Sequence, residues 1–503
     1  MPNLTRRTLL AAPALLAAAG PPGRALAQGA QTLGVGVVSD PVTLDPAFSA
    51  SFFENAVMYN LHETLLVAAP DGAVEPGLAT HASPDPLRHV LTLRDGLTFH
   101  DGTRLDAAAV KANLDRYLDP ATASIRKADL GPLQEVAVTG PLTVELRLSA
   151  PYAPLPLVLT NRAGMVVSPD ALRRLGPDFA TQAVGCGAYK FASWTKNSEL
   201  VLERFDGYWR GRAGGFDRLV FRPIPDETVR LANLRSGTLQ LVDAVPPQAV
   251  AGLAREAGLR VSQMPSLGFN AWSLNTTRKP FDDPRVRRAF VAAVDPEVVQ
   301  RVVYFGTGRV AHGPLSPAVA WAFDKDFAPP GHDPVRAKAL LAEAGAPIPL
   351  PLTITVTNSP QMVRIAQVAQ AQANEAGFRV DVRQVDPSSL ITVLRQRDFD
   401  VCMSPWSGRY DPDGNMFFYF SKGGPNNFPG YDDDEVTGWL AEARTATDPA
   451  VRVRLYHQAQ RKLAEDAPML FLHFDAIIQA SNARLSWTQY PDAVFRLHDA
   501  RMS

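Results

Sequence analysis

The spacing of hydrophobic residues changes period repeatedly along this chain. Short apolar or alternating runs typical of β-strands occur at 33–38, 90–93, 143–148, 200–204, 218–221, 239–242, 268–274, 352–356, 378–382 and 399–403. Apolar residues recur every three or four positions at 57–65, 107–118, 226–234, 284–294, 335–344 and 360–376, which predicts helices. Asp106 is typical of a helix start and Gly345 of a helix end. This alternation of strands and helices predicts an α/β fold.

The length of the chain predicts more than one domain. Its 503 residues exceed what one hydrophobic core normally supports. The part up to about residue 242 is rich in strands, a second large region opens at Gly268, and no low-complexity linker separates them. We therefore expect a chain that crosses between two lobes more than once and closes on a ligand like a hinge.

Composition and charge exclude several classes of partner. The formal net charge is -1, so nothing indicates a nucleic acid or an anionic membrane surface as a partner. Only Cys186 and Cys402 are present, which provides neither a zinc ligand set nor a CxxC pair. Either they form one disulfide after export or both are small buried residues, and the sequence leaves this open.

The amino terminus has the features of an export signal. Arg6 and Arg7 precede an apolar run at 9–19, and Ala25-Leu26-Ala27 is an A-x-A-type cleavage site. We expect residues 1–27 to be a signal peptide that is cleaved on export, by the Tat or the Sec route. No cysteine lies near the cleavage site, so no lipid anchor is expected. The mature protein is predicted to be periplasmic and not embedded in the membrane.

Motifs for catalysis do not stand out. The sequence contains no G-x-S-x-G elbow, no P-loop and no H-E-x-x-H motif. The acidic run at 432–435 either binds calcium or begins a helix, and the helix start is favoured. We predict a protein that is not an enzyme and that needs no cofactor and no metal.

One loop concentrates chemistry that suits a ligand. After the predicted strand at 399–403 come Trp406, Arg409, Tyr410 and Asp411, among turn-forming residues. Open α/β sheets usually bind ligands at the carboxyl ends of their strands. We expect Trp406 and Tyr410 to form apolar walls and Arg409 to provide a fixed charge. The alternative is an ordinary tight turn whose tryptophan belongs to the core.

A set of short motifs, in a fixed order along the mature chain, resembles one protein family. They are Glu75-Pro76-Gly77-Leu78-Ala79, Leu91 to Gly102, Val184 to Tyr189, Phe205-Asp206-Gly207-Tyr208-Trp209, Phe269-Asn270, Pro280 to Phe290, Val294-Asp295, and Trp406 to Asp413. Together they resemble the extracytoplasmic solute-binding proteins of family 5, the peptide/nickel/glutathione/opine-binding group that serves ABC importers.

The resemblance implies a two-lobed periplasmic-binding-protein type II fold with an additional domain in lobe I. The expected core of lobe I comprises residues 28–62, 185–265 and 477–503, and the additional domain comprises 63–184. Lobe II is expected at 266–476. The ligand would be buried between the lobes, where exclusion of water strengthens polar contacts.

The resemblance also bears on the ligand. In family members that bind peptides, an aspartate three residues after the loop tryptophan pairs with the peptide's α-ammonium. Here that position is Arg409, which would repel an ammonium group. Either Asp411 or Asp413 takes the amine, or the ligand presents a carboxylate or phosphate to Arg409. The alternative is a structural salt bridge from Arg409 to Asp411 or Asp413.

Further candidate residues are implied in lobe I. Arg162 resembles a position where nickel-chelate binders use an arginine for the chelator's carboxylates; the alternative is a surface arginine. Ser49, Ser51, Phe52 and Phe53 match the loop that faces the ligand in relatives. Ser49 and Phe52 are taken as binding candidates, with core packing as the alternative for Phe52.

The expected function is the periplasmic substrate-binding component of an ABC importer. Its partners would be a short peptide or a related zwitterionic or anionic solute, and an inner-membrane permease with its ATPase. The protein would act as a monomer and without chemistry of its own. The alternatives are a ligand-presenting sensor or chaperone-like protein and a hydrolase on the same scaffold. Which solute it binds stays open.

Overall fold

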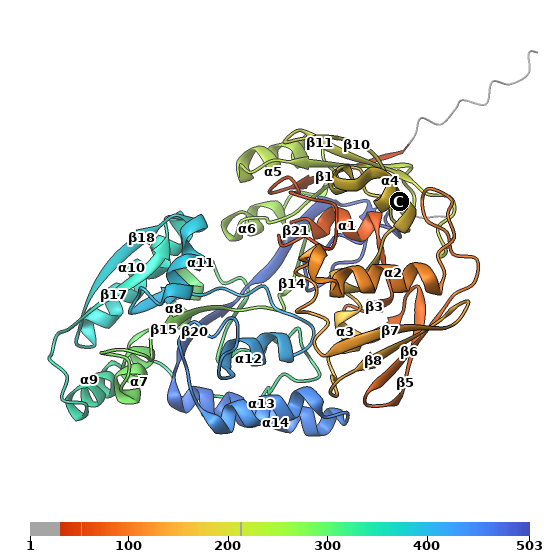
Figure 1. Cartoon of the computed structure of the whole chain (residues 1–503). Helices are drawn as coiled ribbons and strands as arrows, with labels where there is room; N and C mark the ends of the chain where they lie inside the picture. The colour runs from red at the N-terminus through yellow and green to blue at the C-terminus, as the bar shows by residue number, and fades with distance from the viewer. Residues whose placement is uncertain (1–30, 52, 212–213) are drawn as a thin grey trace, which may run out of the picture.

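The computed structural model describes residues 31–51, 53–211 and 214–503. The expected signal peptide and Phe52 lie outside the described residues. Two large sheets organise the chain, and each is the centre of a lobe (Figure 1). Strands alternate with helices throughout, so the predicted α/β class is confirmed.

Lobe I is built on a seven-stranded sheet with the order β10-β11-β12-β1-β13-β21-β14. Its strands are β1 (Thr32–Val37), β10 (Tyr189–Thr195), β11 (Glu199–Arg204), β12 (Arg218–Pro223), β13 (Leu241–Val242), β14 (Leu259–Pro265) and β21 (Ala476–Asn482). The first strand is parallel to both neighbours, β12 and β13, whereas β21 is antiparallel to β13 and β14. The helices of this region are α1 (Asn55–Leu61), α4 (Pro169–Leu175), α5 (Glu227–Arg235) and α6 (Val250–Leu253).

A second layer of lobe I is a four-stranded antiparallel sheet (Figure 1). It comprises β5 (Ala79–Asp85), β6 (Arg88–Leu93), β8 (Thr143–Leu148) and β7 (Leu133–Gly140), with α2 (Ala107–Leu118) and α3 (Leu155–Val158) beside it. Smaller pairs are β2 (Glu63–Thr64) with β9 (Met165–Val166), β3 (Leu66–Ala68) with β4 (Val74–Pro76), and β22 (Leu485–Ser486) with β23 (Arg501–Met502). Alternate apolar residues of β6 and β8 share one buried core with α2.

Lobe II is built on a six-stranded sheet with the order β16-β20-β15-β19-β17-β18. Its strands are β15 (Asn270–Leu274), β16 (Arg309–Val310), β17 (Leu350–Thr357), β18 (Phe378–Val385), β19 (Val401–Met403) and β20 (Met469–Phe474). Its helices are α7 (Pro284–Ala293), α8 (Pro296–Val302), α9 (Pro334–Glu343), α10 (Pro360–Glu375), α11 (Pro387–Gln396), α12 (Asp413–Phe420), α13 (Asp434–Thr445) and α14 (Pro449–Asp466).

Helices cover both faces of the lobe II sheet. Neighbouring residues of β15 point to opposite sides: Trp272 joins the core formed with α7, α9 and α10, and Ala271 joins the core formed with α12, α13 and α14. Both faces of the strand are therefore apolar, which explains its continuous hydrophobic run.

The two lobes are joined by two adjacent crossings. The chain passes from β14 to β15 at 265–270 and returns from β20 to β21 at 474–476. Pro265 is paired with Ala476, and the Ser266 amide donates to the Asp475 carbonyl at 2.9 Å. The expected repeated crossing is therefore present, and its two strands are hydrogen-bonded to each other.

Most element boundaries follow local capping chemistry. The Asp106 carboxylate accepts from the Ala109 amide at 3.0 Å and begins α2, as predicted. The acidic run begins a helix, because Asp433 caps α13. Several boundaries differ from the prediction: α1 ends at Leu61 and does not reach residue 65, and the strand expected at 239–242 is only β13. The strand expected at 378–382 extends to Val385, and the one expected at 399–403 begins at Val401.

Two further findings concern the membrane and the cysteines. In the described part of the chain, no helix combines the length and the apolar character that a membrane span requires. Cys186 and Cys402 are both buried and both free. Burial raises the pKa of both thiols, which keeps them protonated.

Candidate functional site

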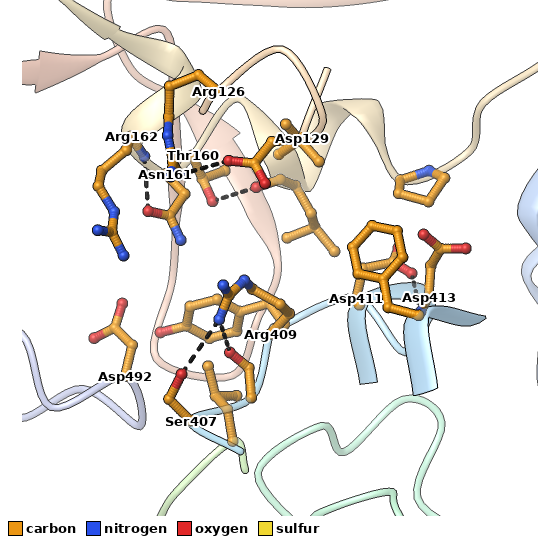
Figure 2. A pocket seen from close by; sticks show the side chains of 18 of the residues that line it. Arg126, Asp129, Thr160, Asn161, Arg162, Ser407, Arg409, Asp411, Asp413 and Asp492 are labelled. Carbon is orange, nitrogen blue, oxygen red and sulfur yellow. Dashed lines mark hydrogen bonds and ion pairs between the residues drawn. The ribbon is translucent and has the colours of Figure 1, made fainter. Parts of the chain in front are cut away.

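A pocket of about 950 Å³, part of it open to solvent, lies where the two lobes face each other. Lobe I provides residues from α1 and from the segments 126–129 and 152–162, and lobe II provides residues 407–418. Asp492 completes the lining from the carboxyl-terminal segment (Figure 2). The pocket is therefore an inter-lobe site, which is where the sequence placed the ligand.

The lobe II wall is a loop between β19 and α12 that one asparagine organises. The Asn415 side chain accepts hydrogen bonds from Trp406 Nε1 at 2.9 Å and from the Arg409 amide at 2.8 Å, and it donates to the Arg409 carbonyl at 2.9 Å. Gly408 has a φ of 80°, and a Cβ there would lie 2.1 Å from the Leu267 backbone. Because only glycine fits, the loop can pack directly on the crossing between the lobes.

Arg409 lies on the pocket wall, and Trp406 lies behind it. The guanidinium carbon of Arg409 sits 4.5 Å from the centre of the Trp406 ring, and its Nη1 donates to the Gly408 carbonyl at 2.7 Å. Trp406 is not among the residues that line the pocket; its ring packs edge-on against Tyr419. Trp406 was expected to form an apolar wall of the pocket. In this structure its ring instead supports the guanidinium group of Arg409.

Arg162 faces the same pocket from lobe I. Its Nη1 donates to the Ser49 carbonyl at 3.0 Å, the Ser49 hydroxyl at 3.1 Å and the Ser51 carbonyl at 3.2 Å. Only 7% of the residue is exposed, so the alternative of a surface arginine is wrong. Burial, with the like charges of Arg126 and Arg409, lowers the pKa of Arg162 to about 10.

Ser49 acts through Arg162 and does not line the pocket. Its side chain is fully buried, and its hydroxyl donates to Glu54 Oε2 at 2.5 Å while accepting from Arg162. The structure therefore places Ser49 as a residue that holds Arg162 in position. Phe52, the other candidate of this loop, is not among the described residues.

Two buried carboxylates of lobe II are held from behind by arginines of α13 and α14. Asp411 accepts from Arg452 Nη2 at 2.6 Å, and Asp413 lies 3.5 Å from Arg444 Nε. Two of these carboxylate oxygens have no hydrogen-bond partner among the described residues: Asp411 Oδ2, and Asp413 Oδ1, which is the oxygen that faces Arg444. The alternative in which Arg409 forms a salt bridge with either aspartate is therefore wrong.

Burial sets the protonation of this acidic pair. It raises the pKa of Asp413 to about 7, and the charge of Asp411 adds to the rise. Burial also lowers the pKa of Arg409, although Asp129 acts in the opposite direction. For Arg452 burial acts to lower the pKa, but Asp411 and Tyr456 together outweigh it, and the pKa of Arg452 is raised.

Tyr410 lines the pocket as expected, and its hydroxyl has no partner among the described residues. Burial raises the pKa of this phenol, so it is a neutral donor or acceptor. It packs in a small apolar cluster with Ala68, Leu267 and Val319. Its position at the junction of both lobes makes it a contact for whatever occupies the pocket.

Several lining residues were not found from the sequence. They are Arg126, Asp129, Tyr152, Thr160, Asn161 and Asp492. Arg126 and Asp129 form an ion pair at 2.5 Å, and Asp492 pairs with Arg496 at 2.7 Å. No motif surrounds them, and they reach the pocket only because distant segments fold together.

The arrangement suits a ligand with both charges. Arg162 and Arg409 are the lining cations that form no ion pair with any described residue, and they approach from opposite lobes (Figure 2). Arg126, by contrast, is paired with Asp129. A carboxylate between the two free guanidinium groups and an ammonium group near the aspartates would complete the charge balance of the pocket.

In the described residues, no group of three or more His, Cys, Asp or Glu side chains is arranged to hold a metal ion. Calcium binding was one of two alternatives for the acidic run at 432–435. Two of its side chains have protein partners: Asp432 pairs with Lys422, and Asp433 caps α13.

Comparison with known proteins places this site in context. The family model of bacterial extracellular solute-binding proteins, family 5, matches residues 73–428. The glutathione-binding protein GsiB of Salmonella paratyphi A is 30% identical over 481 residues, which is 93% of each chain. GsiB of Escherichia coli O157:H7 is 29% identical over the same length and shares.

Solved structures share the fold. The periplasmic binding protein DppA from Helicobacter pylori, in complex with the peptide STSA, superposes with a TM-score of 0.82 at 24% identity, covering 94% of this chain and 98% of that chain. NikZ from Campylobacter jejuni, in complex with Ni(L-His), gives a TM-score of 0.81 at 22% identity over 93% and 99% of the two chains. The two-lobed fold expected from the sequence is therefore confirmed.

Proposed function

The chain belongs to family 5 of the bacterial extracellular solute-binding proteins, and from this premise we propose that it captures a short acidic or zwitterionic peptide for an ABC importer. The protein would act in the periplasm after removal of residues 1–27, without a lipid anchor. An inner-membrane permease with its ATPase would receive the ligand. Family members and relatives are described as binding proteins, which supports capture without chemistry.

One observation carries the proposed ligand class. Two guanidinium groups, those of the buried Arg162 and the half-buried Arg409, face one pocket from opposite lobes, and neither has a carboxylate partner among the described residues. Burying a charge without a counter-ion is unfavourable, so the pocket gains most from an anionic group that contacts both. A carboxylate that bridges them would also draw the lobes together.

The amine of a zwitterion has its own place in the pocket. The side chain of Arg409 disfavours an ammonium group near it, because like charges repel, and they do so more strongly in a half-buried site than in water. Asp411 and Asp413 line the same pocket and each keeps one oxygen without a hydrogen bond. We assign the ligand's ammonium group to these two carboxylates and its carboxylates to the arginines.

Glutathione is the natural first test, because it is a short peptide with two carboxylates and one amine. The relatives that align over 93% of the chain carry glutathione-binding names. The pocket of about 950 Å³, part of it open to solvent, lies in the size range of small-ligand sites.

The domain limits are also a proposal. We assign residues 28–62, 185–265 and 477–503 to the core of lobe I, 63–184 to its additional domain, and 266–476 to lobe II. The composition of the sheets supports this division, because the seven-stranded sheet takes strands from all three segments of the first group.

The test compares glutathione with its diethyl ester by isothermal titration calorimetry on the mature protein. The ester keeps the amine and the peptide bonds but removes both negative charges. We expect glutathione to bind and the ester to bind about tenfold or more weakly, since charge-assisted contacts to carboxylates are lost.

Two outcomes would contradict the proposal. Equal affinity for glutathione and its ester would remove the arginines from recognition. If glutathione does not bind, native mass spectrometry of protein purified from the periplasm must show a co-purified acidic or zwitterionic peptide, and a neutral or cationic ligand there would overturn the ligand class.

A further inference from the structure

A second large cavity lies entirely within lobe II. It encloses about 1410 Å³, part of it open to solvent, and shares no lining residue with the inter-lobe pocket. Its walls are α7, the carboxyl-terminal half of α14, the start of β20 and the connection that runs from 311 to 332. In Figure 1 α7 lies at the outer side of lobe II, and α14 runs along the lower edge of that lobe.

The floor of this groove is apolar. Ala292 and Val294 from the α7 end, Leu463 from α14, and Met469 and Leu470 from β20 line it, and all are buried. These side chains also belong to the packed layers of lobe II. The floor is therefore a rigid apolar surface, which is the usual lining of small-ligand sites.

A buried polar side chain without a partner faces this apolar floor. Gln460 on α14 lines the groove, is 4% exposed, and forms no hydrogen bond with any described residue. A Cβ at Gly313 would lie 3.1 Å from its amide carbon, so the connection passes close to the glutamine. The amide atoms are not sealed from solvent, so in the groove they can hydrogen-bond to water or to a ligand.

The charge at the groove is positive. Arg288 on α7 has a buried Nε without a partner and forms no ion pair with the described residues, and Arg336 stands exposed at the start of α9. Glu465 is the one carboxylate among the described lining residues, and Arg461 is already paired with Asp324 at 2.9 Å. The groove is thus complementary to a molecule with an anionic head and an apolar body.

We propose that this groove is a second ligand site, which binds a small amphipathic carboxylate such as a medium-chain aliphatic acid. The carboxylate pairs with Arg288 and accepts from the amide of Gln460, and the apolar body covers Leu463 and Met469. The site is independent of the inter-lobe pocket and of the function proposed for it.

The experiment titrates the mature protein with decanoate by calorimetry, with and without saturating glutathione. We expect decanoate to bind at one site whether or not glutathione is present. Decanol, which has the same chain without the charge, should bind about tenfold or more weakly.

Variants locate the site. Arg288→Ala should weaken decanoate by about tenfold or more, whereas Arg364→Ala, which removes an exposed arginine of α10 outside the groove, should leave its affinity unchanged. Ala464→Trp fills the groove from α14 and should abolish decanoate binding. Circular dichroism and urea denaturation of all three variants show that each is folded.

Three outcomes overturn the proposal. They are no binding of decanoate to the folded protein, displacement of decanoate by glutathione, and decanoate affinity that is unchanged by both Arg288→Ala and Ala464→Trp. A peptide or protein segment that competes with decanoate in the groove would replace the carboxylate as the assigned occupant.

Discussion

The two walls of the inter-lobe pocket hold their charges in different ways. In lobe I, Arg162 is fixed by three acceptors on a neighbouring loop, and Arg126 is neutralised by Asp129. In lobe II, the carboxylates are held by arginines from the helices behind them, and within the described part of the chain the Arg409 side chain donates hydrogen bonds only to its own loop. Lobe I presents a fixed cation, and lobe II presents fixed anions with one loosely held cation.

This difference indicates that the arginines of the two lobes have different roles in binding a ligand. A cation that already has three acceptors has little freedom to move toward a ligand. Arg409, stacked on Trp406 and bonded within its loop, can change its rotamer at small cost. We therefore expect lobe I to define where the ligand's carboxylate sits and Arg409 to complete its contacts on closure.

The largest expected effect tests whether the lobe II wall depends on its buried ion pair. Arg452→Ala would leave Asp411 buried without its counter-ion, and the free energy of unfolding should fall by about 3–5 kcal/mol. Urea denaturation of the purified variant measures this. The exposed pair of Arg88 with Asp85 provides the matched control, and Arg88→Ala should leave the midpoint nearly unchanged. A small loss of stability for Arg452→Ala would show that the structure of the lobe II wall does not depend on this ion pair.

The next effect depends on pH and concerns Asp413. Its pKa in the folded protein is raised from an ordinary 3.8 to about 7, so the folded state binds this proton more tightly than the unfolded state does. The associated stability is present below about pH 4 and is lost as the pH rises toward 7, at roughly 1.4 kcal/mol per pH unit. The Asp413→Asn variant lacks this group.

Urea denaturation of wild type and Asp413→Asn between pH 4 and 8 measures that loss. The wild type should lose stability relative to the variant up to about pH 7, and the difference should then be constant. Parallel curves over the whole range would show that Asp413 is ionised throughout. The charge of the lobe II carboxylates would then be as independent of pH as that of the lobe I arginine.

The smallest effect separates the two arginines directly. Arg162→Ala and Arg409→Ala should each weaken an acidic peptide by about 1–3 kcal/mol, through loss of a charge-assisted contact. Only Arg162→Ala should also destabilise the protein, because it leaves the Ser49 and Ser51 acceptors without their donor. Calorimetry and urea denaturation of both variants measure this, and equal losses of stability would remove the distinction between the walls.

The sequence predicted what depends on local chemistry. The helix start at Asp106 and the strands around 143–148 follow from capping and periodicity, and the structure has both. The short strand β13 differs from its predicted range of 239–242. It is held by its neighbours β1 and β21, and the pattern of its own residues does not set its limits. The order of strands in either sheet was not predictable from periodicity, since it depends on contacts between distant segments.

The site was predictable to a similar degree. Arg409, Tyr410, Asp411 and Arg162 line the pocket, and the loop that presents the first three was identifiable from its turn residues. Trp406 has the residue type of a pocket wall, but Arg409 lies between it and the pocket. The sequence could not predict this arrangement, because no motif specifies the contact between the two side chains.

The position of β21 has a consequence for how the protein is made. This strand lies between β13 and β14, yet it comes from residues 476–482, more than two hundred positions later in the chain. During synthesis the lobe I sheet keeps an open slot, with unpaired edges on both sides, until nearly the last residues leave the ribosome. Lobe II can fold first. The lobe I sheet, and with it the two-lobed structure, is completed only when β21 inserts into it.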